Sequence, residues 1–249
     1  ACLSGAVPHH YTGAFYGSVL VDGHDTCEVS LTDISQIVGS VLQDIDTQMV
    51  ASVVEDEMLF GLENFGVPHD QIEQHVSETL KTVGISDLRD REIATLSGGQ
   101  KQKVAIAAIL AMRPRVLVLD EPTAALDPAS STLVFETLRE ANRALGITIV
   151  VVEQKVALLS EYCNRVLVLD HGQIALQGEP HEVFARTDEL RTIGVDCPRV
   201  TRIFNSLEAD GLVSGTPCLD VDEAERLITE IVDPDRATSD TQAPAGSPH

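Results

Sequence analysis

The chain has 249 residues, and its 17 Lys and Arg are outnumbered by 39 Asp and Glu, which gives a formal net charge of −22. This charge excludes a nucleic-acid binder that relies on phosphate contacts, because such proteins need basic surfaces. The longest apolar run is the nine residues from Val104 to Met112. A membrane-spanning helix needs roughly 20 such residues, so we expect no membrane span in this sequence.

The acidic excess extends along the whole chain. At roughly 1 M salt the screening length falls to about 3 Å, which weakens repulsion between like charges. We therefore interpret the composition as that of a protein from a halophile with a salt-rich cytoplasm. An ordinary acidic cytosolic protein is the alternative. Five cysteines occur without a Cys-x-x-Cys pair and are expected to be reduced core thiols: Cys2, Cys27, Cys163, Cys197 and Cys218.

The chain begins without a methionine or a signal peptide. Its first eight residues read like the last turn of a helix, closed by Gly5 and Pro8. This pattern predicts an N-terminally truncated fragment. Two apolar runs of strand length follow, at residues 17–23 and 37–42.

A helical period replaces the strand pattern from Val54. Apolar positions recur after three acidic residues that suit a helix N-terminus. A second amphipathic helix follows a break at residues 66–68, and its apolar stripe ends before Gly84.

The middle of the chain alternates between strand and helix. Residues 116–119 and 147–152 read as buried parallel strands, and a helix capped by Asp127 and ending at Gly146 connects them. This βαβ series predicts a right-handed α/β layer. Residues 166–169 and 174–176 flank a turn signal, so the sheet is expected to end in an antiparallel pair. Two short helices are expected near residues 200–207 and 224–231, and a disordered tail from residue 233.

Two segments carry the chemistry. Residues 96–100 open a long helix with Ser97, Gly98 and Gly99, whose backbone N–H groups and hydroxyl can receive a phosphate. The apolar strand 116–119 ends in Asp120 and Glu121. Asp120 can hold Mg²⁺ through water, and Glu121 can polarise an attacking water. Together the two segments indicate phosphoryl transfer to water.

These segments resemble the signature and Walker B motifs of the ATP-binding cassette (ABC) family, and the resemblance covers residues 1 to 230. Gln43 resembles the Q-loop glutamine, and residues 125–127 resemble the D-loop, which crosses the dimer interface. The resemblance implies an α/β P-loop NTPase (RecA-like) ABC ATPase core with a helical signature subdomain. It places the ATPase domain at residues 1–185, the helical subdomain at about 54–112 and a small helical extension at 186–232, before the disordered tail at 233–249.

The resemblance also implies that two cassettes sandwich two ATP molecules with Mg²⁺. The signature of one subunit serves the nucleotide of the other. It assigns nucleotide binding to Ser97, Gly98, Gly99, Gln100 and Asp127, the metal to Asp120 and Gln43, and catalysis to Glu121, Gln154 and Gln43.

A narrower resemblance comes from residues 54–57 with 60–64, and from residues 194–200 with 219–224. These segments look like those of the ATPases of energy-coupling-factor transporters, which drive uptake of vitamins and of cobalt or nickel ions. The implied partners are a second ABC ATPase subunit, a transmembrane T subunit and a substrate-binding S subunit. The implied location is peripheral, on the cytoplasmic face of the cell membrane.

The sequence departs from the family in two places. First, it contains no Gly-Lys pair, since its four lysines follow Leu or Gln. The P-loop and its strand are therefore missing, and we expect the chain alone to be inactive. Second, Gln154 stands where the family has the H-loop histidine. Glutamine can donate a hydrogen bond but cannot change charge near pH 7. We favour a positional role for this residue, with slower hydrolysis as the alternative.

Two other functions stay open. A non-catalytic cassette could pair with an active partner and supply only its signature face. A soluble cassette protein acting on DNA or ribosomes would carry coiled-coil insertions or basic patches, which this sequence lacks.

Overall fold

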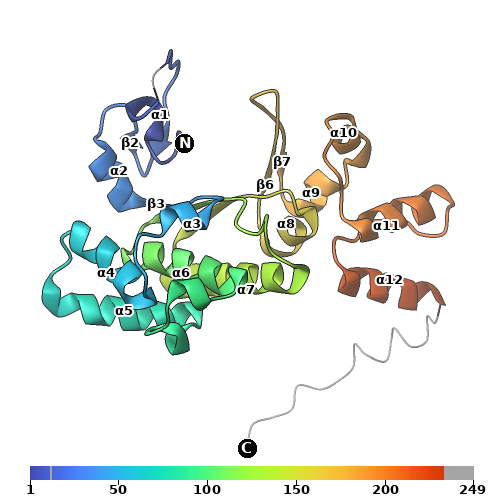
Figure 1. The fold of residues 1–249 in the computed structure, drawn as a ribbon. Coiled ribbons are helices and arrows are strands. Elements are labelled where there is room, and N and C mark those ends of the chain that lie inside the picture. The colour runs from blue at the N-terminus through green and yellow to red at the C-terminus, as the bar shows by residue number, and fades with distance from the viewer. Residues whose placement is uncertain (12, 233–249) are drawn as a thin grey trace, which may run out of the picture. The chain divides into compact units, whose positions relative to one another are not determined.

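The computed structural model describes residues 1–11 and 13–232. The chain forms two compact units, Ala1–Gln154 and Lys155–His249 (Figure 1). The predicted disordered tail at residues 233–249 lies outside the described residues.

The first unit is built on three parallel strands in the order β3-β4-β5. They are β3 (Val38–Val41), β4 (Val116–Asp120) and β5 (Thr148–Val152). In this register Leu119 pairs with Val41 on one side and Val151 on the other. Helix α7 (Pro128–Leu145) connects β4 to β5, so the predicted βαβ series is confirmed. As predicted, Asp127 caps the start of α7 and Gly146 ends it in a left-handed conformation.

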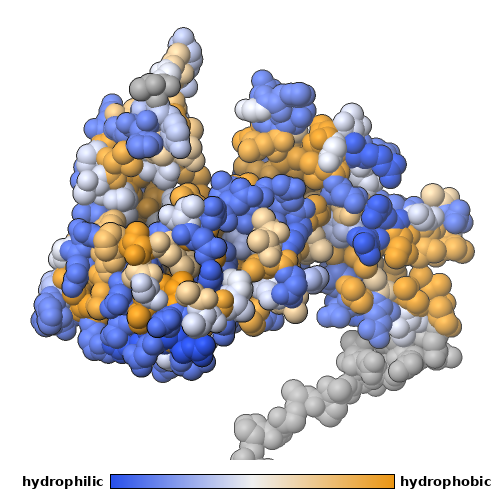
Figure 2. All heavy atoms as spheres, viewed as in Figure 1, coloured by the Kyte–Doolittle hydropathy of each residue, from blue (hydrophilic) through white to orange (hydrophobic). Residues whose placement is uncertain are grey.

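Three helices form the main core of this unit: α4 (Val54–Asn64), α5 (His69–Val83) and α6 (Gly98–Ala111). Their apolar faces meet in one cluster that also includes Leu117 and Leu119 of the sheet. Figure 2 shows hydrophilic residues along the outer surface of α5, as expected for an amphipathic helix. Gly84 ends α5 at φ 71°. The helices predicted from the periodicity are confirmed.

The start of the chain differs from the prediction. Its first elements are α1 (Ala6–His9), β1 (Leu20–Val21), β2 (His24–Asp25) and α2 (Leu31–Ile37). The helix expected to end at Gly5 instead begins there, with Gly5 as its N-cap at φ 72°. The run 17–23 gives only the two-residue strand β1, which forms a hairpin with β2. Shorter connectors are α3 (Ile45–Gln48) and the 3₁₀ turns η1 (Ser86–Leu88) and η2 (Ile93–Thr95).

The second unit contains a hairpin and five helices among its described residues. Strands β6 (Val166–Asp170) and β7 (Gln173–Gly178) pair antiparallel, as the turn signal predicts. The prediction that this pair ends the parallel sheet is wrong: among residues 1–11 and 13–232, β6 is hydrogen-bonded to β7 alone and forms a separate two-stranded sheet. The helices are α8 (Val156–Tyr162), α9 (Pro180–Phe184), α10 (Thr187–Thr192), α11 (Arg199–Ala209) and α12 (Val221–Val232).

Helices α11 and α12 confirm the two helices expected after residue 200. The expectation that the cysteines are core thiols is wrong for Cys2 and Cys27, which are exposed, and right for Cys197 and Cys218. Within the part of the chain that the structure describes, no helix is long and apolar enough to cross a bilayer.

Candidate functional site

The carboxylate of Glu121 is the meeting point of three segments. Gln43 Nε2 donates to Glu121 Oε2 over 2.9 Å, and Gln154 Nε2 donates to Glu121 Oε1 over 2.5 Å. The two glutamines lie 78 and 33 residues away in the sequence. The structure therefore brings together the three residues that the sequence predicts to be catalytic.

The parallel sheet explains this convergence, because the carboxyl ends of parallel strands meet at one edge. Gln43 lies two residues after β3, Glu121 directly after β4, and Gln154 two residues after β5. The backbone of Glu121 is tied to the same edge, since its N–H donates to the Val152 carbonyl over 2.8 Å. Glu121 has a positive φ of 45°, a conformation that costs free energy in a residue other than glycine and is often found at functional sites.

The same edge offers oxygen ligands for a cation. Asp120 is the last residue of β4, and its side chain is exposed. Gln43 uses its amide nitrogen for Glu121, which leaves its amide oxygen available. Mg²⁺ prefers oxygen ligands and usually takes only one or two carboxylates, completing its shell with water and substrate phosphates. Residues 1–11 and 13–232 contain no group of three or more His, Cys, Asp or Glu arranged for a metal. The Asp120 carboxylate and the Gln43 amide oxygen are the kind of ligands that Mg²⁺ takes beside phosphate oxygens.

Two residues that the sequence reasoning missed shape the loop that carries Gln43. The side chain of Gln48 accepts a hydrogen bond from Leu42 N–H at 2.9 Å and donates to the Ser40 carbonyl at 3.1 Å. The buried carboxylate of Glu57 accepts hydrogen bonds from the N–H groups of residues 50 and 51, at 2.9 and 2.8 Å. Gln48 gave no periodic signal. Glu57 lies among the acids that suit a helix N-terminus. Only its position on the apolar face of the helix separates it from the neighbouring acids.

The segment predicted to be the signature lies at the start of α6. Ser97 Oγ accepts from Gln100 N–H at 3.3 Å, and Gln100 Oε1 accepts from Ser97 N–H at 3.0 Å. This reciprocal capping box satisfies the helix start. Gly98 and Gly99 follow as the first two helical residues, whose N–H groups have no acceptor within the helix. An anion can be bound by these N–H groups, as the sequence predicts.

The D-loop turn packs against these glycines within the same chain. A Cβ added at Gly98 would lie 3.2 Å from Leu126 Cδ2, and one added at Gly99 would lie 3.2 Å from Ser130 Cβ. Asp127 Oδ1 accepts from Ser130 N–H at 3.0 Å, and its Oδ2 accepts from the Ser130 hydroxyl at 2.6 Å. These hydrogen bonds lower the pKa of Asp127. The resemblance implies that Asp127 lies at a dimer interface, and in the structure its side chain caps α7.

An ion pair joins the two sites' supporting elements. Lys101, directly after the signature, donates from Nζ to Asp46 Oδ1 of α3 over 2.7 Å. Since α3 lies in the Gln43 loop, the start of the signature helix is connected to the segment that contacts Glu121.

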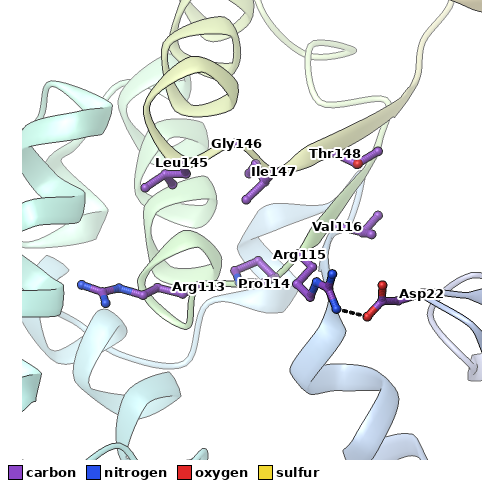
Figure 3. Close-up of a pocket in the computed structure, with 9 residues that line it drawn as sticks. All are labelled: Asp22, Arg113, Pro114, Arg115, Val116, Leu145, Gly146, Ile147 and Thr148. Carbon is purple, nitrogen blue, oxygen red and sulfur yellow. Dashed lines mark hydrogen bonds and ion pairs between the residues drawn. The ribbon is translucent and has the colours of Figure 1, made fainter.

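A cavity of about 550 Å³ lies at the other edge of the sheet, at the amino ends of β4 and β5 (Figure 3). Its two arginines are already paired, Arg115 with Asp22 and Arg113 with Glu78. Because their charges are compensated and the three catalytic candidates lie at the opposite strand ends, this cavity takes no part in the candidate site.

Comparison with known proteins identifies the family of this chain. The chain is 38% identical over 216 residues to the energy-coupling factor transporter ATP-binding protein EcfA1 of Clostridium perfringens, which covers 86% of this chain and 76% of that protein. The chain belongs to the ABC transporter ATP-binding protein family. The family profile described as ABC transporter matches residues 9–124 of this cassette. EcfA1 of Symbiobacterium thermophilum is 43% identical to the cassette over 218 residues, with 86% of this chain and 75% of that protein covered.

A solved structure shows the same fold. The cassette resembles cbiO1 from Clostridium perfringens, described as part of the ABC transporter complex cbiONQ, with a TM-score of 0.66 and 36% identity. The match covers 78% of this chain and 76% of that one. The predicted α/β ABC ATPase fold is thereby confirmed.

Proposed function

We propose that this cassette binds and hydrolyses ATP as the motor subunit of an ABC importer of the energy-coupling-factor type. The observation that carries the proposal is the Glu121 carboxylate at the end of β4, held by amides from the segments after β3 and β5. Similarity to EcfA1 proteins and to cbiO1 supports it.

Glu121 acts in this proposal as the group that orients and polarises the attacking water. An ionised carboxylate has about four lone-pair positions. The two amides occupy one position on each oxygen, so each oxygen keeps one for a water molecule. A carboxylate fixed at both oxygens cannot swing away, and it presents its remaining lone pairs in a constant direction, which favours in-line attack.

Asp120 and the amide oxygen of Gln43 would hold Mg²⁺. When bound, the ion would neutralise charge on the phosphates of ATP. In the same proposal Ser97, Gly98, Gly99, Gln100 and Asp127 serve the nucleotide of a second ABC ATPase subunit. A phosphate there would take the N–H groups of Gly98 and Gly99, and Ser97 would exchange its capping hydrogen bond for one to the ligand.

The proposed partners beyond the second ATPase are a transmembrane T subunit and a substrate-binding S subunit. The cassette would lie on the cytoplasmic face of the membrane, attached through the T subunit. The transported compound would be a vitamin or a transition-metal ion chosen by the S subunit.

The identity of residue 154 favours one alternative function. Because the resemblance implies a histidine at this position, the chain could be the non-catalytic cassette of a heterodimer, in which the partner's glutamate supplies all the turnover.

The test uses the product of the whole reading frame, purified with the membrane subunits that co-purify with it. We expect magnesium-dependent ATP hydrolysis that falls at least about 100-fold in Glu121→Gln, which removes the charge and keeps the shape. The matched control is Glu140→Gln on the exposed face of α7, which should leave turnover unchanged. Full turnover in Glu121→Gln would overturn the catalytic role and support the heterodimer alternative. Absence of any ATPase activity in the unmodified complex would reject both.

A further inference from the structure

Glu153 occupies an unusual position beside the candidate site. It directly precedes Gln154, and its carboxylate accepts hydrogen bonds from two neighbouring segments. Its Oε2 accepts from the Thr123 hydroxyl over 2.7 Å, and its Oε1 accepts from the backbone N–H of Gln154 over 3.0 Å. Thr123 is completely buried, at 0% exposure, and Glu153 is half-buried.

These bonds close a ring between the turn after β4 and the segment after β5. Three hydrogen bonds connect the two segments: Glu121 N–H to the Val152 carbonyl, Thr123 Oγ1 to Glu153, and Gln154 Nε2 to Glu121. Glu153 also fixes the main chain from which the Gln154 side chain extends. The direction of the Gln154 amide therefore depends on the neighbouring carboxylate of Glu153.

The chemistry of the ring requires a carboxylate at 153. The Thr123 hydroxyl and the Gln154 backbone N–H are both donors, and a carboxylate is an acceptor at both oxygens. A glutamine could accept from only one of them, and its NH₂ group would face the other donor. The buried hydroxyl of Thr123 needs an acceptor because a polar group removed from water must be hydrogen-bonded.

We propose that Glu153 is a positioning residue for the reaction at Glu121, acting through the main chain of Gln154 and the hydroxyl of Thr123. This inference rests on the proposed ATPase function. Misplacing a group by about 1 Å can cost roughly 100-fold in rate. Loss of the ring should thus lower turnover while leaving ATP binding, which uses other residues, unchanged.

The test measures ATPase kinetics of the complete, membrane-partnered protein for Glu153→Gln, Thr123→Val and Thr123→Ser, with Glu140→Gln as the matched control. Glu153→Gln and Thr123→Val should each lower kcat about 10- to 100-fold, with the KM for ATP within about twofold of its original value. Thr123→Ser keeps the hydroxyl and should retain turnover. Because Thr123 and Glu153 are partners, the double variant Thr123→Val, Glu153→Gln should be no slower than the slower single variant.

A second readout needs no nucleotide. Hydrogen exchange of the backbone amides at 121, 123, 124 and 152–155 should be faster in Glu153→Gln and Thr123→Val than in Thr123→Ser, because the ring no longer protects them. If Glu153→Gln fails to fold, comparing kcat and hydrogen exchange between Thr123→Val and Thr123→Ser still tests whether the Thr123 hydroxyl positions the site.

The inference is overturned by an unchanged kcat in a folded Glu153→Gln or Thr123→Val protein, by multiplicative losses in the double variant, or by a rise in KM alone. In those cases, reduced ATP hydrolysis in Glu121→Gln would still support the proposed ATPase function. An unmodified complex without ATPase activity overturns both together.

Discussion

The Glu121 carboxylate is held by two uncharged amides, from Gln43 and Gln154. Amide donors do not titrate, so neither donor of this clamp changes its charge between pH 6 and pH 8. An imidazole at the same position would be half-protonated near pH 6.5 and would add a pH-dependent charge. We infer that the task of residue 154 is to orient Glu121, for which a neutral donor suffices.

Removing the amide should therefore matter more than changing its kind. Gln154→Ala loses a hydrogen bond to a charged group, worth about 1.5 kcal/mol or more, and we expect kcat to fall about tenfold. Gln154→His retains a donor and should keep turnover within about threefold at pH 8. The measurement is steady-state ATPase activity of both variants from pH 6 to 8. A large gain in Gln154→His would show that the charge of a histidine, and not its position, limits the present rate.

Helix α6 and the turn before α7 depend on each other more closely than their motifs suggest. The signature glycines accept close contact with Leu126 and Ser130, and Lys101 binds Asp46 in the Gln43 loop. The signature segment is thus packed between the D-loop turn and α3. Such packing lets a displacement of one segment reach the other two, since close-packed groups shift together.

The two signature glycines should differ in their tolerance of a methyl group. In Gly98→Ala the new Cβ meets the flexible end of Leu126, which can turn away. In Gly99→Ala it meets Ser130 at Cβ, next to the backbone of α7, so overpacking should cost about 1 kcal/mol or more. We expect Gly99→Ala to lower the free energy of unfolding by that amount relative to Gly98→Ala, measured by urea denaturation. Equal stabilities would show that α7 yields without cost.

An arginine connects helices α4 and α5 through ion pairs. Arg89 contacts Glu55 of α4 and Glu73 of α5, the latter from Nη2 to Oε2 over 2.7 Å. Hydrogen bonds from Arg89, and then from Ser77, lower the pKa of Glu73 to about 2. The ordinary value is 4.5, so the stabilising effect is fully present above that pH and is lost as the pH falls toward 2.

Arg89→Ala should consequently lower the melting midpoint at pH 7, and the difference from the unmodified protein should shrink as the pH falls below 4.5. Arg143→Ala is the control, because Arg143 forms an exposed 3.5 Å pair with Glu140 on α7 and such pairs contribute little. Melting curves from pH 7 down to the lowest pH at which the protein stays folded test this. A difference that does not depend on pH would assign the role of Arg89 to packing of its aliphatic stem.

Local patterns predicted the helices and the parallel strands, because periodicity and apolar runs are visible in the chain, whereas the grouping of Gln43, Glu121 and Gln154 was implied only by the resemblance to the ABC family. The separate β6-β7 sheet was not predictable, since a hairpin signal does not say which strand edge it joins. The contacts of Gln48, Glu57 and Glu153 were also missed. Each binds the backbone or hydroxyl of a loop whose position depends on tertiary packing. The roles of the site residues and the proposed domain boundaries stay predictions.

The net charge of −22 affects the folding stability of the whole chain. The 39 Asp and Glu outnumber the 17 Lys and Arg more than twofold, so the basic side chains cannot compensate the acidic charge. Repulsion among unpaired surface charges opposes the compact state and is reduced by salt. The composition therefore still favours the interpretation that this cassette works in concentrated salt.

We expect the melting midpoint to rise by about 5 °C or more between 0.05 and 1 M KCl, which corresponds to roughly 2 kcal/mol of relieved repulsion. Differential scanning calorimetry in KCl measures this without the general stabilisation that sulfate salts give by exclusion from protein surfaces. Repeating the series with a variant in which four exposed acids of α5, η1 and α12 are changed to their amides should give a smaller rise: Asp70→Asn, Asp87→Asn, Asp222→Asn and Glu225→Gln. A midpoint that does not move with KCl in either protein would mean that the acidic surface is already tolerated at low salt, and the halophilic interpretation would be lost.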